Sequence, residues 1–347
     1  MKDQTVEGFR VPAVEVWISE NVPELTPPLK WVRLEGGHSN LTFKLEDVYG
    51  THAVIRRPPL GQLQPKAHDM GREWKLISSL GPTSIPVPQA YGICTDHEVT
   101  GASFYVMEHV EGRPLFTIED TLDVVPESKR GSVAFSLFDV LADIHLLDPD
   151  DIGLGDIGKK GGYVERQLKA WYGSWMASVI PANYDDPRAH TLHTYLQKNI
   201  PTQGSVSLLH GDYGFHNCLV GHDSNVVAVL DWEISSLGVP LADLAYALNR
   251  WSDPDDVVVV DPLSSTRAPG MPTRSELAQR YASRTGYSLD SLGYFRALSF
   301  WKSASIIHGV YSRYVNGQKS AEGVDLDLWR ERIERCLTAA EDIIQKL

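Results

Sequence analysis

The chain has 347 residues, of which 42% are hydrophobic and 22% are charged, and its formal net charge is -13 at pH 7. This length and composition are typical of a globular protein with a substantial core and room for two lobes. The acidic balance argues against nucleic acid or an anionic membrane as a partner, because affinity for both depends largely on Lys and Arg. It would suit a cationic small molecule, although many enzymes are acidic for solubility alone.

The sequence also lacks the signals of secreted and membrane proteins. No apolar segment approaches the roughly 20 residues that a membrane span requires, and the polar first residues do not resemble a secretory signal. Cys94, Cys218 and Cys336 form no C-x-x-C pair, so neither a disulfide framework nor a zinc site is predicted. We therefore expect a cytoplasmic protein.

The first third of the chain predicts an antiparallel sheet with one helix. Residues 31–45 read as a hairpin around a Gly36-Gly37 turn, and residues 52–57 read as a strand that ends at Pro58-Pro59. Residues 68–80 read as a helix, which Gly81-Pro82 stops. The helix places four apolar residues at helical spacing, namely Met70, Trp74, Ile77 and Leu80.

The turn of the hairpin has two readings. Gly36 and Gly37 permit backbone geometries that other residues resist, and Ser39, Asn40 and the turn amides can reach phosphate oxygens. A purely structural hairpin would show the same residues, because Gly-Gly turns are common.

The remainder of the chain has a helical character. We place the lobe boundary after the strand at 103–111, which divides the chain into residues 1–111 and 112–347. Residues 133–147 predict a buried helix, in which His145 is a core histidine. Thr273 and Glu276 form a capping box ahead of a helix that Gly286 closes. The acidic, Pro-rich stretch 252–270 is either a solvated loop or a substrate lid.

The strongest chemical signal lies in residues 208–233. His210-Gly211-Asp212 is followed by Asn217, an apolar strand at 226–230, and Asp231-Trp232-Glu233. Phosphoryl transfer from a nucleotide needs such groups: Asp212 would accept the proton of an attacking hydroxyl, and Asn217 and Asp231 would hold Mg²⁺. The order is that of the catalytic and metal-binding loops of protein kinases. Gly211 replaces their Arg, and Trp232-Glu233 replaces the Phe-Gly of their metal loop.

These departures resemble the aminoglycoside phosphotransferase and choline kinase-like enzymes, whose loops read H-G-D-x-x-x-x-N and D-W or D-x-E. The branch fused to acyl-CoA dehydrogenases is the most similar, and the resemblance runs from about Trp31 to Tyr314. It implies an α+β, protein-kinase-like, two-lobed fold, with an antiparallel sheet and a helix in the N-lobe and a mostly helical C-lobe. It also implies transfer of the γ-phosphoryl group of ATP, or of GTP, to a hydroxyl of a small molecule.

The resemblance assigns roles to the loop residues. Asp212 and His210 form the catalytic pair, in which Asp212 is the base or orienting group and His210 fixes the loop. Asn217 and Asp231 are the metal ligands, and Glu233 assists a second metal. In the segment at 238–246, Asp243 would cap or brace the helix that follows and hold the catalytic loop, a supporting role rather than a part in the chemistry.

The N-lobe residues receive nucleotide-binding roles. Arg56 stands where kinases carry the lysine that contacts the α- and β-phosphates, and Glu73 is its expected ion-pair partner. Arg57 should point to the opposite face of the strand, and both arginines could instead be solvated edge charges. Main-chain groups of Glu108, His109 and Val110 would pair with adenine. Gly36, Gly37, Ser39 and Asn40 would contact the phosphates.

Two other classes of function stay open. A pseudokinase would bind nucleotide without turnover, and the substitution at Arg56 is its support. A hydrolase would use Asp212 and His210, but the sequence shows no nucleophile or metal set for it. A protein kinase is disfavoured, because no A-P-E segment follows Asp231. The acceptor could be an aminoglycoside, an amino alcohol, a sugar or a hydroxyacyl thioester.

Overall fold

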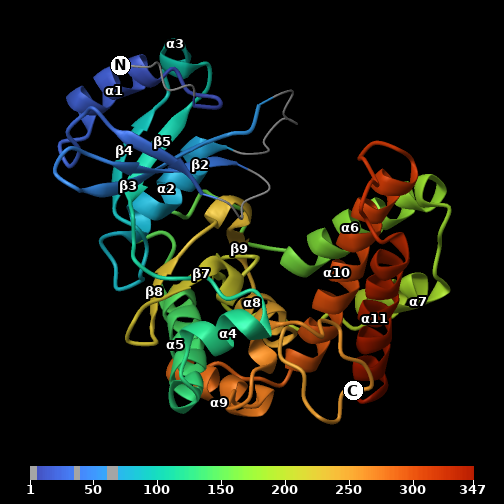
Figure 1. Cartoon of the computed structure of the whole chain (residues 1–347). Helices are drawn as coiled ribbons and strands as arrows, with labels where there is room; N and C mark the ends of the chain where they lie inside the picture. The colour runs from blue at the N-terminus through green and yellow to red at the C-terminus, as the bar shows by residue number, and fades with distance from the viewer. Residues whose placement is uncertain (1–5, 35–39, 61–68) are drawn as a thin grey trace.

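The computed structural model describes residues 6–34, 40–60 and 69–347 and has a small N-terminal lobe above a larger helical lobe (Figure 1). The N-lobe is a five-stranded antiparallel sheet with the strand order β1-β2-β3-β5-β4. Its strands are β1 (Lys30–Arg33), β2 (Leu41–Glu46), β3 (His52–Arg57), β4 (Ala90–Cys94) and β5 (Phe104–Glu108).

The two faces of this sheet pack against different helices because side chains alternate along a strand. Ile55 of β3 joins a core with α1 (Val11–Asn21), whereas its neighbour Val54 joins a core with α2 (Met70–Leu80). A short helix, α3 (His97–Thr100), lies beside α1. Helix α1 lies outside the elements that the sequence pattern predicts.

Helix α2 begins two residues later than predicted, because the side chain of Asp69 caps it by accepting from Arg72 N. Its buried residues are Met70, Glu73, Leu76, Ile77 and Leu80, and Trp74 is only partly buried. Three of the four residues predicted for the apolar face are therefore buried, and Trp74 packs against the core. The buried face also includes a charged residue, Glu73, which pairs with Arg56 of the sheet.

The C-lobe is mostly helical, which confirms the predicted fold class. Helices α6, α10 and α11 pack side by side on one flank of the lobe, and α5 and α9 pack at its base (Figure 1). The helices are α4 (Ile118–Val124), α5 (Glu127–Leu146), α6 (Tyr163–Ala182), α7 (Pro187–Lys198), α8 (Pro240–Leu248), α9 (Arg274–Thr285), α10 (Leu292–Val315) and α11 (Leu326–Gln345). In the described ranges, no helix is both long enough and apolar enough to cross a bilayer.

Two short antiparallel pairs carry the loops of interest. Strand β6 (Ser207–Leu209) pairs with β9 (Ser236–Gly238), and β7 (Cys218–Val220) pairs with β8 (Val226–Val229). Helix α5 starts at Glu127, directly after Pro126, which is six residues earlier than predicted. It packs against β6 and β8, and Tyr213, in the loop that follows β6, donates its hydroxyl to Leu137 O of this helix at 2.7 Å. The capping box of α9 and its end at Gly286 are as predicted.

The connection between the lobes runs from the end of β5 to the start of α4. Arg113 of this segment forms a β-bridge with Val220 in the C-lobe. We keep residues 1–111 and 112–347 as the proposed division of the chain.

Arg57 is a structural residue of the N-lobe. Its side chain points away from that of Arg56, as the alternation of a strand requires, but it is 5% exposed and is not a solvated edge charge. The guanidinium donates to Thr100 O at 3.0 Å and to Pro58 O at 3.2 Å, and it also bonds to Gly8 O. It therefore ties the N-terminal segment to the sheet.

We expect Arg57→Met to lower the free energy of unfolding by about 1–3 kcal/mol, because it leaves buried carbonyl groups without a donor. Urea denaturation would measure this. Arg33→Met is the matched control, since the Arg33 side chain is half exposed and pairs with the equally exposed Glu7, and exposed ion pairs contribute about 0–1 kcal/mol. Equal losses in both variants would contradict the structural role of Arg57.

Candidate active site

His210 anchors the loop that follows β6. Its imidazole is fully buried, and its Nε2 donates to Leu230 O at 2.8 Å, next to Asp231. Its Nδ1 accepts from Asp212 N at 3.3 Å. With both nitrogens bonded inside the protein, His210 links the two predicted functional loops and is not placed to exchange protons with a substrate.

Asp243 holds the same loop from the opposite side. This residue, 2% exposed on α8, accepts from His210 N at 2.6 Å and from Gly211 N at 3.0 Å. It lies in the first turn of α8, and its bonds to His210 and Gly211 are those of the expected residue that holds the loop. Gly211 has a φ of +88°, and a Cβ there would lie 3.3 Å from Ile234. The glycine is therefore required by the backbone at this position.

Three side chains surround the Asp212 carboxylate. His216 Nε2 lies 3.0 Å from Oδ1, Asn217 Nδ2 lies 3.2 Å from Oδ2, and the Tyr246 hydroxyl also donates to Oδ1. Burial alone would raise the pKa of Asp212, but the hydrogen bond and charge of His216 and the bond from Tyr246 outweigh it and hold the pKa well below its ordinary value. Asp212 is therefore an oriented carboxylate with a third of its surface exposed.

The predicted metal ligands lie on either side of this loop. Asn217 ends a 3₁₀ turn, η1 (Phe215–Asn217), and its main-chain oxygen accepts from Leu230 N at 2.8 Å, which sets Asp231 beside it. Asp231 has a φ of +64°, a conformation that is uncommon outside glycine. The amide oxygen of Asn217 and the carboxylate of Asp231 are donors of the kind that Mg²⁺ prefers, so these residues fit the predicted ion.

Arg56 connects the N-lobe to the metal loop. Its Nη1 lies 2.7 Å from Glu73 Oε1 on α2, and its Nη2 lies 2.9 Å from Asp231 Oδ1 in the C-lobe. The first contact is the ion pair that the sequence predicts, and the second one was not foreseen. Burial raises the pKa of Glu73, and the charge of Arg56 opposes that shift.

A cavity of about 300 Å³ separates the two lobes at this point. Arg56, Glu73 and Asp231, which contact one another, form the polar end of its lining, and residues 108–110 also line it. Apolar walls come from both lobes, through Val54, Ile77, Met107, Leu219 and Val229. A polar end with apolar walls is typical of a site for a small molecule or cofactor.

The hinge residues differ in what they offer a ligand. Glu108 N already donates to Gln89 O at 2.8 Å, so its N–H is not available to adenine. No described residue bonds to the main-chain N–H of Val110, which lines the cavity. Gly36, Gly37 and Ser39 lie outside the described residues. Asn40 is described and buried, and its Nδ2 lies 3.4 Å from Glu233 Oε2.

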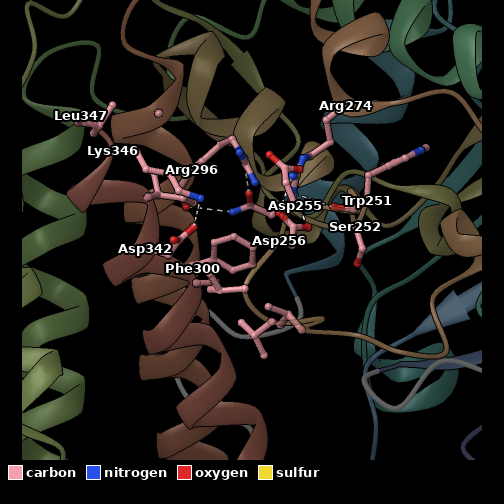
Figure 2. Close-up of a pocket in the computed structure, with 17 residues that line it drawn as sticks. Trp251, Ser252, Asp255, Asp256, Arg274, Arg296, Phe300, Asp342, Lys346 and Leu347 are labelled. Atoms are coloured by element: carbon pink, nitrogen blue, oxygen red, sulfur yellow. Dashed lines mark hydrogen bonds and ion pairs between the residues drawn. The ribbon is translucent and has the colours of Figure 1, made fainter.

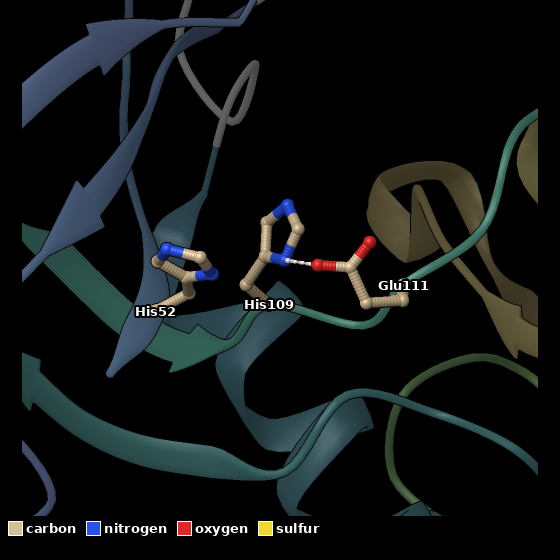
Figure 3. Close-up of side chains that lie close together, drawn as sticks. All are labelled: His52, His109 and Glu111. Carbon is tan, nitrogen blue, oxygen red and sulfur yellow. Dashed lines mark ion pairs between the residues drawn. The ribbon is translucent and has the colours of Figure 1, made fainter. Parts of the chain in front are cut away.

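A second group of possible metal ligands lies at the rim of the hinge. His52, His109 and Glu111 bring one ligand atom each to within 4.8 Å of one another (Figure 3). The shortest contact is 3.5 Å, between His109 Nδ1 and Glu111 Oε1. Burial lowers the pKa of His109, which favours the neutral ring.

The acidic loop after α8 borders a different cavity. Asp253 and Asp256 pair with Arg274 at 2.8 and 2.5 Å, and the loop lies against α10 and α11 (Figure 2). This cavity of about 240 Å³ shares no lining residue with the cavity between the lobes. The structure therefore places this part of the loop against the helices of the C-lobe.

Sequence reasoning missed two residues of the site. His216 and Tyr246 both lie inside segments that the sequence singles out, yet neither received a role. The signal for His216 was its place in the loop between Asp212 and Asn217. Tyr246 could be found only from the helical spacing of α8, which puts it one turn after Asp243 and close to Asp212.

The two lobes and this arrangement of groups define a kinase-like phosphotransferase. A family model described as the phosphotransferase enzyme family matches residues 30–278, and the chain belongs to that family. The human acyl-CoA dehydrogenase family member 11 is 33% identical over 323 residues, which cover 90% of this chain and 40% of that protein. The chain thus spans about two-fifths of the length of this relative.

Two solved structures of phosphotransferases have the same fold as this chain. A putative aminoglycoside phosphotransferase from Ralstonia eutropha superposes with a TM-score of 0.81 at 31% identity, over 96% of this chain and 99% of that one. The ADP-bound aminoglycoside phosphotransferase APH(2'')-Ib has a TM-score of 0.60 at 14% identity, over 96% and 99% of the two chains. The second likeness shows the fold alone.

The depressed pKa of Asp212 predicts the direction in which the free energy of unfolding changes with pH. A carboxylate with a depressed folded-state pKa stabilises the protein above its unfolded value, about 3.9, and loses that contribution as the pH falls further. We expect the stability difference between wild type and Asp212→Asn to stay constant from pH 7 to pH 5 and to begin shrinking near pH 4. Urea denaturation at several pH values measures it. A difference that changes already near pH 6 would show that the pKa is raised.

Proposed function

We propose that this phosphotransferase transfers the γ-phosphoryl group of ATP to a hydroxyl group of a small molecule. The observation that carries the proposal is that Asp212 and Asn217 lie on one loop, which His210 and Asn217 bond to the loop of Asp231, and that Asp231 lines the cavity between the lobes. The adenine would lie between the apolar walls and bond to the main chain of residues 108–110. GTP is the alternative donor.

Asp212 orients the attacking hydroxyl. A carboxylate with a low pKa is a weak base, so it accepts a hydrogen bond from the hydroxyl and takes its proton only as the new bond to phosphorus forms. This suits phosphoryl transfer, whose transition state is loose in most analyses and whose catalysis is mostly positioning and charge stabilisation. His216 and Tyr246 fix the direction of the carboxylate, and His210 fixes the loop.

The charges of the nucleotide are matched by the polar end of the cavity. Mg²⁺ held by Asn217 and Asp231 would offset the charge of the phosphates, with Glu233 near a second ion. Arg56 would contact the phosphates while Glu73 holds its guanidinium in place. Asn40 and the turn that carries Gly36, Gly37 and Ser39 would cover the phosphates.

The names of the relatives support two of the four candidate classes of acceptor. The matching proteins named as acyl-CoA dehydrogenases support a hydroxyacyl thioester, and the aminoglycoside phosphotransferases support an aminoglycoside. Amino alcohols and sugars complete the candidate set. A cytoplasmic location stays a prediction.

The test is a panel of these four acceptor classes, incubated with the protein, Mg²⁺ and either ATP or GTP. Mass spectrometry would detect the phosphorylated acceptor, and EDTA should abolish its formation. Asp212→Asn should keep ATP affinity and lose about a hundredfold or more in turnover, since a positioned base contributes roughly 10² to 10⁴. Binding of ATP without consumption would favour the pseudokinase, and absence of ATP binding would favour a hydrolase.

A second prediction concerns Arg56. Arg56→Ala should weaken ATP binding and turnover, whereas Arg56→Lys should lie between Ala and wild type, because lysine keeps the charge but loses the planar fork that spans Glu73 and Asp231. Calorimetry with ATP and Mg²⁺ measures the affinity, and thermal unfolding shows that the variants are folded. Arg33→Ala, at an exposed position on β1, is the control. Unchanged ATP affinity in Arg56→Ala would remove Arg56 from the site.

A further inference from the structure

Lys302 is a partly buried cation beside the catalytic loop. It lies on α10 and borders a narrow hollow that is also lined by Gly211, Asp243 and Tyr246. Its Nζ lies 5.7 Å from the centre of the Trp171 ring on α6. Across the described ranges, no carboxylate oxygen lies within ion-pair distance of this ammonium group.

Arg250 is a second cation on the same side of the loop. It follows α8, and its Cδ atom lies 3.2 Å from the place where a side chain on Gly214 would begin. Burial lowers the pKa of His216 and the charge of Arg250 adds to that shift, whereas burial raises the pKa of Tyr246 and the charge of Arg250 opposes it; both residues bond to Asp212. Within the described part of the chain, Arg250 forms no ion pair either.

The carboxylates near these cations are already engaged. Asp243 accepts the main-chain N–H groups of His210 and Gly211, and Asp212 accepts from three side chains. Burial lowers the pKa of Lys302, and the more distant charges of Asp243 and Asp212 oppose that shift. A buried charge without a close partner is costly to a fold, and such groups cluster at functional sites.

We infer that the acceptor carries an anionic group, a carboxylate or a phosphate, which Lys302 binds while Asp212 holds the reacting hydroxyl. Arg250 adds a second positive charge on that side. The inference rests on the proposed function and narrows its acceptor class. Aminoglycosides and amino alcohols are cationic, so they would meet like charge here and are disfavoured.

A structural role for Lys302 makes a different prediction. If its only task were to balance the charge of Asp243, its loss would loosen the catalytic loop and lower kcat for every acceptor alike. A residue that binds the anionic group instead affects KM for anionic acceptors and leaves neutral ones unchanged.

The experiment compares matched acceptors of equal chain length: hydroxyalkanoates, hydroxyalkyl phosphates, diols and amino alcohols. We expect wild-type kcat/KM to be at least about tenfold higher for an anionic acceptor than for the matched diol, since one hydrogen bond to a charged group contributes about 1.5–3 kcal/mol. Lys302→Met should raise KM for anionic acceptors by about tenfold or more, with kcat and the KM for ATP retained. Lys302→Arg should keep part of the affinity. Lys169→Met, at an exposed position on α6, is the control.

The outcomes separate the two proposals. Phosphorylation of diols or amino alcohols in preference to anionic acceptors, or an equal loss for all acceptors in Lys302→Met, overturns this inference and leaves the kinase standing. If ATP binds but no acceptor is phosphorylated, the proposed function fails. Calorimetric titration of a hydroxyalkanoate and of the matched diol into the enzyme then tests the inference. The inference requires that the anion bind more tightly than the diol in wild type and that Lys302→Met lose this preference.

Discussion

The contact of Arg56 with both Glu73 and Asp231 is the interaction on which the site depends. It joins β3 and α2, which belong to the N-lobe, to the metal loop of the C-lobe. Each contact is a charge-assisted hydrogen bond in a partly or fully buried setting, where such bonds are shorter and stronger than neutral ones. The planar guanidinium reaches two carboxylates at once, which the single ammonium of a lysine does with less geometric definition. The position of Asp231 is thus set from the N-lobe as well as from its own hairpin.

The catalytic loop is held independently of that contact. Asp243 accepts two main-chain N–H groups from the loop, and His210 bonds to the residue before Asp231. Breaking these bonds would leave buried polar groups without partners, which costs free energy. The loop therefore has few alternatives to its observed conformation. Asp212 is consequently oriented before any ligand arrives, and the reaction requires little rearrangement of the C-lobe side of the site.

Local patterns in the sequence predicted what local physics decides. The capping box at Thr273, the apolar strand ahead of Asp231, and the order of Asp212, Asn217 and Asp231 all follow from neighbouring residues, and the structure has each of them. Features set by long-range packing were missed or misplaced. The inward turn of Glu73 depends on Arg56, the burial of Arg57 depends on Gly8 and Thr100, and Tyr246 reaches Asp212 only through the fold. For Glu73 and Arg57 no pattern within one element carries that information, and for Tyr246 the spacing of α8 gives only its place one turn after Asp243.

Net charge and local charge lead to opposite expectations for the acceptor. A net charge of -13 suggests a cationic partner, yet charges more than about 8–10 Å apart at the surface are largely screened at physiological salt. By the inference above, an acceptor beside Asp212 would meet Arg250 and Lys302, and the low dielectric of a partly buried site would strengthen their effect relative to distant surface carboxylates. Mg²⁺ would further reduce the negative charge on the nucleotide side. The local balance around the reacting hydroxyl therefore favours an anion, and the acidity of the whole chain is better explained by solubility.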